Sequence, residues 1–140
     1  MNAYHFPQLD ETIYMDTLSN GLRVCVVPRP GFSRRLAYFV TDFGSIHTDF
    51  LLEGREIHAP AGIAHFLEHK MFDLPQGNAM QEFAKYGGGN NAFTSYSMTA
   101  YYFECTENFE ENLSVLLQRT TTPYRTPQFF CFSYTSVVRL

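Results

Sequence analysis

The sequence predicts an α+β fold, with short strands and helices following one another in one domain of 140 residues. Three observations carry this prediction. Asn20-Gly21, between two β-rich stretches, is the strongest short signal for a β-hairpin. Pro60 and Pro75 bracket a stretch that reads as a helix. An alternating stretch that ends at Cys105 indicates a strand, and an apolar helical stripe follows it.

The first elements are a hairpin and a third strand. Residues 12–17 and 22–28 are rich in β-forming side chains and are joined by Leu18-Ser19-Asn20-Gly21, so we predict that they pair. Residues 35–43 have the composition of a further strand. We interpret residues 44–59 as an irregular, partly polar connection. His47 and His58 lie in it, and we interpret them as solvated loop histidines because neither has a suitably spaced partner.

The helix predicted over Ala61–Leu74 carries His65, Glu68 and His69. At about 100° per residue, His69 lies about 40° and Glu68 about −60° from His65, so all three share one face. Two histidines one turn apart can bind one metal ion through their ring nitrogens. A carboxylate beside them can take a proton from a water held on that metal.

This H-x-x-E-H pattern is the inverted form of the H-E-x-x-H signature of zinc proteases. The inversion moves the carboxylate from one flank of the histidine pair to the other, and either flank can reach a bound water. The motif alone leaves open a second interpretation, in which two surface histidines merely neighbour a glutamate.

The next predicted elements are a helix and a turn. Asn78 is placed to start a second helix, and Gly87 is placed to end it in left-handed geometry. We interpret the glycine run 87–89 as a plain turn. The alternative is a phosphate cradle, but no Lys-Ser/Thr pair follows and no helix begins there.

Residues 91–105 are rich in Thr, Tyr and Phe and indicate two strands. Alternation in the second strand places four side chains on one face: Thr99, Tyr101, Phe103 and Cys105. A helix follows with an apolar stripe at helical spacing, formed by Phe109, Leu113, Leu116 and Leu117. We interpret these apolar residues as core.

Composition excludes several classes of function. The net charge is −4 without a Lys/Arg cluster, so binding to nucleic acid is not expected. No apolar run approaches the roughly 18 residues of a membrane span, and the first residues lack the features of a signal peptide. Cys25, Cys105 and Cys131 are widely spaced and odd in number, which indicates reduced thiols in a cytoplasmic protein.

The tail differs from the residues before it. No Asp or Glu occurs between Asn112 and Leu140, and residues 119–140 show neither a helical nor a strand period. We therefore expect two parts, a domain over residues 1–118 and an atypical tail over 119–140. Disorder or a shifted reading frame would account for such a tail.

Several motifs in order resemble the insulinase/pitrilysin family of zinc metallopeptidases. They are the H-x-x-E-H of the helix, Asn90-Asn91-Ala92-Phe93-Thr94-Ser95, Thr99-Ala100-Tyr101-Tyr102, the helix over residues 107–117 and the early hairpin LSNGLRVCVVPRP. The resemblance covers about residues 10–118, because the motifs lie in this range. It is closest to the bacterial processing-protease-like members. It implies a mainly antiparallel sheet with helices packed on one face.

The resemblance also implies a site. Zinc would be bound by His65 and His69, and Glu68 would activate its water for hydrolysis of a peptide bond. The strand with Asn91, Ala92, Phe93 and Thr94 would be a sheet edge to which a peptide or protein substrate adds as an extra strand. An edge strand offers unpaired backbone groups, which hold an extended peptide with little demand on its side chains.

Two parts of the family site do not fall within this sequence. A catalytic zinc normally has three protein ligands. In this family the third ligand is a glutamate about 75 residues past the second histidine. That position lies beyond Leu140, so we expect one zinc ion in an incomplete site. The family also encloses its substrate between two homologous domains or subunits, and only one is present here.

Two functions follow from these expectations. The first is a zinc-dependent metalloendopeptidase domain that is incomplete or inactive as this chain alone. The alternative is a non-catalytic, peptide-binding or subunit-like half-domain that pairs with an active relative. Whether the chain itself is an enzyme stays open at this point.

Overall fold

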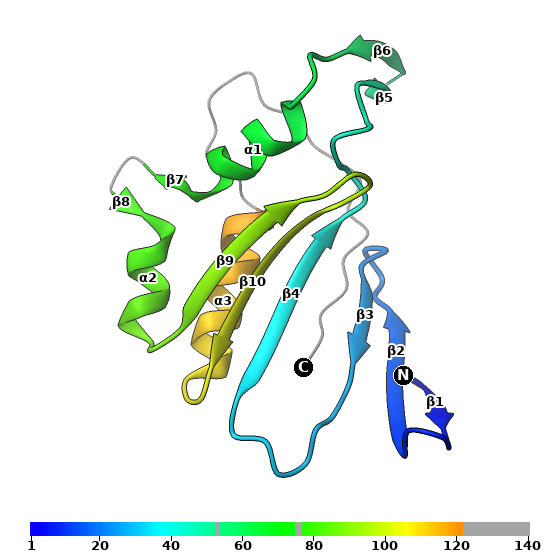
Figure 1. Ribbon diagram of the computed structural model, residues 1–140, viewed down its shortest axis with the longest axis vertical. Coiled ribbons are helices and arrows are strands. Elements are labelled where there is room, and N and C mark those ends of the chain that lie inside the picture. Colours follow the sequence, from blue (N-terminus) through cyan, green and yellow to red (C-terminus); the bar gives the residue numbers. More distant parts are fainter. Residues whose placement is uncertain (53, 75–76, 122–140) are drawn as a thin grey trace.

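The computed structural model describes residues 1–52, 54–74 and 77–121 (Figure 1). Strands predominate in the first half, and three helices follow. The elements run in the order β1 (Asn2–Phe6), β2 (Glu11–Thr17), β3 (Arg23–Val26), β4 (Arg35–Thr41), β5 (Asp49–Leu52), β6 (Arg55–His58), α1 (Ile63–Phe72), β7 (Asp73–Leu74), β8 (Gly77–Asn78), α2 (Ala79–Lys85), β9 (Gly89–Thr94), β10 (Thr99–Cys105) and α3 (Phe109–Thr121).

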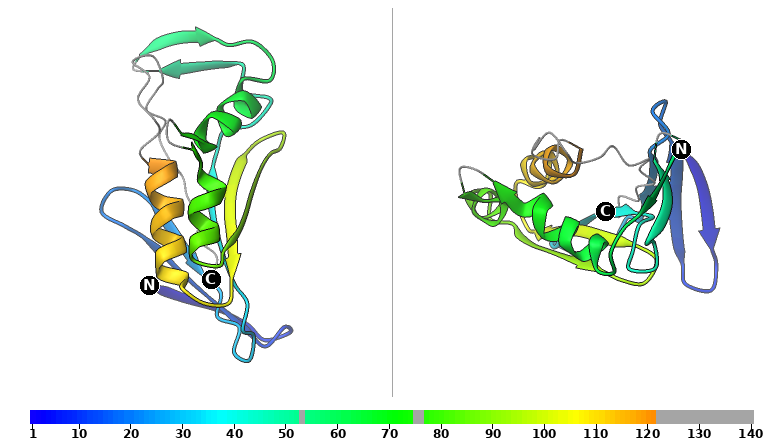
Figure 2. Two further views of the ribbon diagram at one scale, coloured as in Figure 1. Left: turned by 90° about the vertical axis from the view of Figure 1, so that its left-hand side faces the viewer. Right: turned by 90° about the horizontal axis from the view of Figure 1, so that it is seen from above.

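The central sheet has the strand order β4-β10-β9, and both of its strand pairs are antiparallel. Tyr102 of β10 lies opposite Tyr38 of β4 on one side and Asn91 of β9 on the other. Helices α2 and α3 cover one face of this sheet, as Figure 2 shows from the side and from above. Helix α1 lies across the end of β9. The predicted α+β fold, with a mainly antiparallel sheet and helices packed on one face, is confirmed.

The core lies between the central sheet and helix α3. The four residues predicted to share one face of β10 are all buried, and Ala100 of the other face is buried too; the four are Thr99, Tyr101, Phe103 and Cys105. Burial also raises the pKa of the Cys105 thiol. Leu116 of α3 is buried against this face, and the rest of the predicted stripe packs beside it. Cys25 and Cys105 are free thiols, whereas Cys131 lies outside the described residues.

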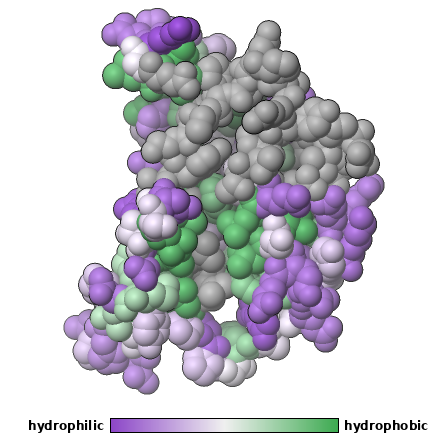
Figure 3. Space-filling view, turned by 180° about the vertical axis from the view of Figure 1, so that it is seen from behind, coloured by the Kyte–Doolittle hydropathy of each residue, from purple (hydrophilic) through white to green (hydrophobic). Residues whose placement is uncertain are grey.

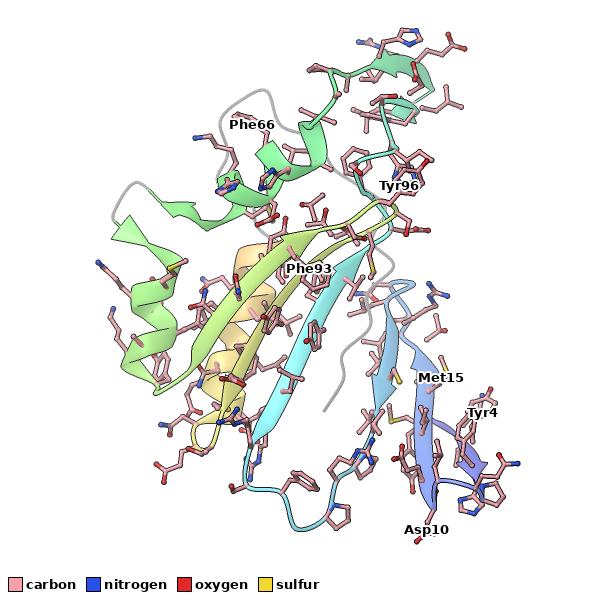
Figure 4. The ribbon with its side chains drawn as sticks, viewed as in Figure 1. Tyr4, Asp10, Met15, Phe66, Phe93 and Tyr96 are labelled. Carbon is pink, nitrogen blue, oxygen red and sulfur yellow. The ribbon has the colours of Figure 1, made fainter. Side chains whose placement is uncertain are left out.

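The amino-terminal sheet has the order β1-β2-β3. The predicted hairpin is confirmed, with Thr17 opposite Arg23. Strand β1 was not predicted, and it pairs antiparallel with β2. Apolar side chains on this sheet remain exposed, among them Tyr4 and Met15 (Figure 4). The register places Tyr4 opposite Ile13 of β2. Met15 is two residues beyond Ile13 on the same strand, so Tyr4 and Met15 lie on the same face of the sheet.

The prediction of an irregular connection over residues 44–59 is wrong. Strands β5 and β6 form a hairpin there, with Asp49 opposite His58. Gly54, at φ 78°, supplies the left-handed turn conformation that the other residues avoid. His58 is not a lone loop histidine, because its Nδ1 lies 2.5 Å from Asp49 Oδ1. This hydrogen bond is the main reason that the pKa of Asp49 is lowered.

The second helix and its end agree with the sequence. Helix α2 is followed by Gly87 at φ 70°, and Gly88 donates its N–H to the carbonyl oxygen of Phe83 at 3.0 Å. These contacts cap the last turn of α2, so the glycine run acts as a turn. The run also packs closely on α3, because a Cβ on Gly88 would lie 2.1 Å from Asn112 Oδ1.

Helix α3 continues to Thr121, so the first residues of the predicted tail are helical, while residues 122–140 lie outside the described part. The division into a domain and a tail stays a prediction. A shallow hollow on α3 is lined by Glu110, Leu113, Ser114, Leu117 and Gln118. Hydrophobic residues gather in the middle of the rear face of the molecule (Figure 3). Among the described helices, none is long and apolar enough to cross a membrane.

Candidate metal centre

Helix α1 presents the H-x-x-E-H residues beside the end of the central sheet. It spans Ile63–Phe72, shorter than the range predicted between the two prolines, because residues 73 and 74 belong to β7. Its first turn is closed by the N–H of Ile63, which donates to the carbonyl oxygen of Pro60 at 3.2 Å. The helix therefore begins two residues before His65, and all three site residues lie within it.

The two histidines are exposed and lie close together. Their Nε2 atoms are 3.1 Å apart, and their ring centroids are separated by 4.7 Å. Two nitrogens bound to one tetrahedral zinc at about 2.0–2.1 Å would lie about 3.3 Å from each other. The pair therefore already has the separation of two ligands on one ion, and solvent or a substrate can reach it.

Glu68 differs from the two exposed histidines because the residue is only 8% exposed. The nearest ligand atoms of His65, Glu68 and His69 all lie within 4.8 Å of one another. Among the residues that the structure describes, no other group of three or more His, Cys, Asp or Glu side chains is arranged to hold a metal ion. The structure thus brings together the three residues that the helical spacing placed on one face.

A hydrogen bond from the sheet holds the Glu68 carboxylate. Thr94, the last residue of β9, donates its hydroxyl proton to Glu68 Oε2 at 2.8 Å. Thr99 lies opposite Thr94 at the start of β10, with 3.3 Å between their hydroxyl oxygens. Thr99 in turn donates to the carbonyl oxygen of Phe43 at 2.8 Å. Sequence reasoning named Thr94 only as part of a substrate-binding strand and missed this side-chain contact.

The strand β9 is at the edge of the central sheet among the described strands. Asn91 and Phe93 are exposed, whereas Ala92 and Thr94 are half-buried on the helix-covered side. Ser95 donates its N–H to the carbonyl oxygen of Met98 at 2.8 Å. Because bonded and non-bonded pairs alternate along an antiparallel ladder, the backbone groups of Ala92 and Thr94 point away from β10.

Aromatic side chains near this edge are accessible. Phe66, on α1, is 49% exposed, and Phe93, on β9, is 40% exposed. Figure 4 shows them with Tyr96, which is 69% exposed at the tip of the β9–β10 hairpin. Phe93 meets the ring of Tyr102 edge-on, with the centroids 6.5 Å apart. Exposed aromatics of this kind suit contacts with apolar side chains of a bound peptide.

Comparison with known proteins identifies the family. The family model for Insulinase (Peptidase family M16) matches residues 55–129, which is more than half of the chain. The uncharacterized zinc protease YmfH of Bacillus subtilis is 46% identical over 123 residues. This chain belongs to the insulinase family, M16. The human insulin-degrading enzyme is 30% identical over 117 residues, which cover 80% of this chain and 10% of that protein.

Solved structures of M16 proteins have the same fold. A structure described as an M16-like peptidase from Alicyclobacillus acidocaldarius superposes with a TM-score of 0.78 at 34% identity. The match covers 89% of this chain and 29% of that one. Pitrilysin, at 24% identity and a TM-score of 0.63, shares the fold. The chain spans 29% of the length of YmfH, so it matches less than a third of this M16 relative.

Zinc fits the donor set of the site. Imidazole nitrogens at the observed separation are ordinary zinc ligands, and relatives of this chain are named zinc proteases. The carboxylate of Glu68 completes a group that spans up to 4.8 Å, while the two histidine nitrogens are only 3.1 Å apart.

Proposed function

We propose that this chain carries the zinc-binding part of an M16 metalloendopeptidase. His65 and His69 hold the metal, and Glu68 is the general base. The observation that carries the proposal is the chelating 3.1 Å separation of the two exposed Nε2 atoms beside a buried carboxylate. The relatives support the reaction class, because M16 proteins similar to this chain are named zinc proteases.

The residues divide the work as follows. Zinc, when bound, would act as a Lewis acid that polarises the peptide carbonyl and lowers the pKa of a water molecule bound to it. Glu68 accepts a proton from that water and passes it to the leaving amine. One of its oxygens accepts a hydrogen bond from Thr94, which leaves the other oxygen for the water. The burial of the carboxylate fixes its orientation relative to the histidines.

The edge strand β9 is proposed to hold the substrate. The outward backbone groups of Ala92 and Thr94 can pair with an extended peptide, while Asn91 and Phe93 present side chains on the exposed face. The N–H of Ala92 now donates to Asn91 Oδ1 at 2.8 Å. A peptide carbonyl would replace this local contact, so binding leaves no backbone donor unsatisfied.

The described residues supply two imidazole ligands. The family resemblance predicts a third ligand, a glutamate, beyond Leu140, and a homologous second domain or subunit that closes the site. A polypeptide limited to these 140 residues, with two imidazoles as its protein ligands, would bind zinc weakly and cleave little peptide, because each absent ligand removes a direct bond to the metal.

A peptidase assay tests this proposal. A quenched fluorescent peptide is offered, with zinc, to the chain extended by a family-like segment with the distal glutamate and by a second homologous domain. We expect hydrolysis there, little by the 140-residue chain, and none by the extended Glu68→Gln variant with zinc still bound. Hydrolysis that survives Glu68→Gln, or an extended protein that binds zinc yet never cleaves, would contradict the assignment.

A second candidate is a non-catalytic peptide-binding half-domain. It is favoured by one observation: the β9 edge is formed by the sheet itself and needs no metal. The two candidates differ in their metal dependence. Peptide binding to β9 that is unchanged by a chelator, in a protein that never retains zinc, would favour the half-domain over the peptidase.

A further inference from the structure

The position of Glu68 is set by the sheet as well as by its own helix. Its neighbours His65 and His69 on α1 are exposed, whereas Glu68 is buried against the end of the central sheet. The hydrogen bond that reaches it comes from Thr94, 26 residues further along the chain. A carboxylate next to two histidines on an open helix would otherwise be free to turn toward the same metal ion.

The distances set Glu68 apart from the histidine pair. The histidine nitrogens are 3.1 Å apart, close to the separation of about 3.3 Å expected for two ligands on one zinc. The group of three nevertheless spans up to 4.8 Å, and the extra distance must involve the carboxylate. Glu68 therefore stands further from at least one histidine nitrogen than those two nitrogens stand from each other.

The hydroxyl protons can be assigned from the acceptors. A carbonyl oxygen can only accept, so Thr99 must donate its single proton to Phe43 at 2.8 Å. Thr99 then has no proton for Thr94, whose own proton goes to the nearer and charged acceptor, Glu68 Oε2. A hydrogen bond to a carboxylate is about twice as strong as one between neutral groups. Thr94 is therefore the donor that holds the carboxylate, and Thr99 is held separately by the carbonyl oxygen of Phe43.

We propose that Thr94 is a positioning residue that keeps Glu68 out of the metal's ligand set and so preserves it as a base. The inference rests on the proposed metal site at His65 and His69. Thr94 also has backbone groups that point from β9 toward a bound peptide. In this proposal Thr94 pairs with the substrate through its backbone and holds Glu68 through its hydroxyl. The peptide-binding strand and the metal site are therefore connected through one residue.

Zinc titration of the 140-residue chain by calorimetry tests the proposal without any measurement of activity. In Thr94→Val the carboxylate is released and becomes a ligand. We expect zinc to bind more tightly, because a third protein ligand adds a direct bond to the metal. The gain should vanish in Thr94→Val/Glu68→Gln, since the amide is a poor zinc ligand.

Two further variants serve as controls. Thr94→Ser keeps the hydroxyl and should bind zinc as the wild-type chain does. Thr41→Val removes a hydroxyl that donates to the carbonyl oxygen of Thr99 at 3.3 Å, not to Glu68, and should also leave the affinity unchanged. An unchanged or weaker affinity in Thr94→Val, or a gain that persists in the double variant, would overturn the proposal while leaving the histidine site intact.

A second measurement observes the ligands of the metal directly. X-ray absorption of the zinc-loaded wild-type chain should show histidine nitrogens and water around the metal, without the Glu68 carboxylate. The spectrum of Glu68→Gln should be the same. A carboxylate ligand that is present in the wild type and lost in Glu68→Gln overturns the proposal. A wild-type chain that takes up no zinc overturns both this proposal and the metal site on which it rests.

Discussion

The two three-stranded sheets of this chain are built alike and buried differently. Both are antiparallel, and both alternate their side chains between two faces. In the central sheet Phe39 and Phe103 are at most 1% exposed, because α2 and α3 cover one face. In the amino-terminal sheet Tyr4 is 49% and Met15 is 41% exposed. Alternation of side chains is common to both sheets, but side chains are buried in a core only where helices cover the sheet.

The candidate site lies where the sheet is covered. Thr94, at the end of β9, donates its hydroxyl proton to the carboxylate of Glu68 on α1. The proposed base is thus attached to the best-packed part of the molecule, while the proposed ligands stand at its surface.

The largest effect is expected from Phe103→Ala. Phe103 is fully buried between the ring of Phe83 and that of Phe109, at centroid distances of 5.9 Å and 5.4 Å. Loss of a buried aromatic typically costs about 3–5 kcal/mol of the free energy of unfolding, through lost burial and the cavity left behind. Urea unfolding followed by circular dichroism measures it. A cost below about 1 kcal/mol would mean that the central sheet does not form the core.

A smaller loss of the free energy of unfolding is expected from Gly44→Ala. Gly44 follows β4 and packs on the turn between β9 and β10. The added Cβ would lie 2.5 Å from the nitrogen of Met98 and 2.6 Å from the carbonyl oxygen of Ser95. These are backbone atoms that cannot turn aside, so we expect destabilisation of about 1–3 kcal/mol. Ser45→Ala, at an exposed neighbour, is the matched control and should be close to neutral. Equal unfolding midpoints for both variants would show that the close approach is absent.

The smallest effect is expected from Met15→Ala on the amino-terminal sheet. Because this side chain is already 41% exposed, its truncation should change the free energy of unfolding by no more than about 1 kcal/mol. The same urea experiment measures the change. A loss as large as that of Phe103→Ala would mean that another part of the protein covers this face, and the contrast between the two sheets would fail.

Much of the fold could be predicted from local signals. Asn20-Gly21 marked the first hairpin, the two prolines bracketed α1, and alternation up to Cys105 identified the buried face of β10. Strand β1 escaped because all five of its residues are exposed, so no face pattern marks it. The β5–β6 hairpin escaped because its strands have only four residues each and no Asn-Gly pair joins them.

The site was predictable only in part, for a physical reason. Helical geometry places His65, Glu68 and His69 on one face from their spacing alone. It does not show that the carboxylate is buried while the imidazoles are exposed, since burial depends on what packs against the helix. The contact between Glu68 and Thr94 joins residues 26 positions apart, and no local period encodes it.

The measurement that tests the central claim most directly is zinc titration of the 140-residue chain by calorimetry, with His65→Ala, His69→Ala and Glu68→Gln beside the wild type. We predict one weakly bound zinc, lost in either histidine variant because the site has no ligand to spare, and retained in Glu68→Gln. Zinc binding that is unchanged by both histidine substitutions would place the metal elsewhere. Zinc lost on Glu68→Gln would make Glu68 a ligand and contradict its role as the base.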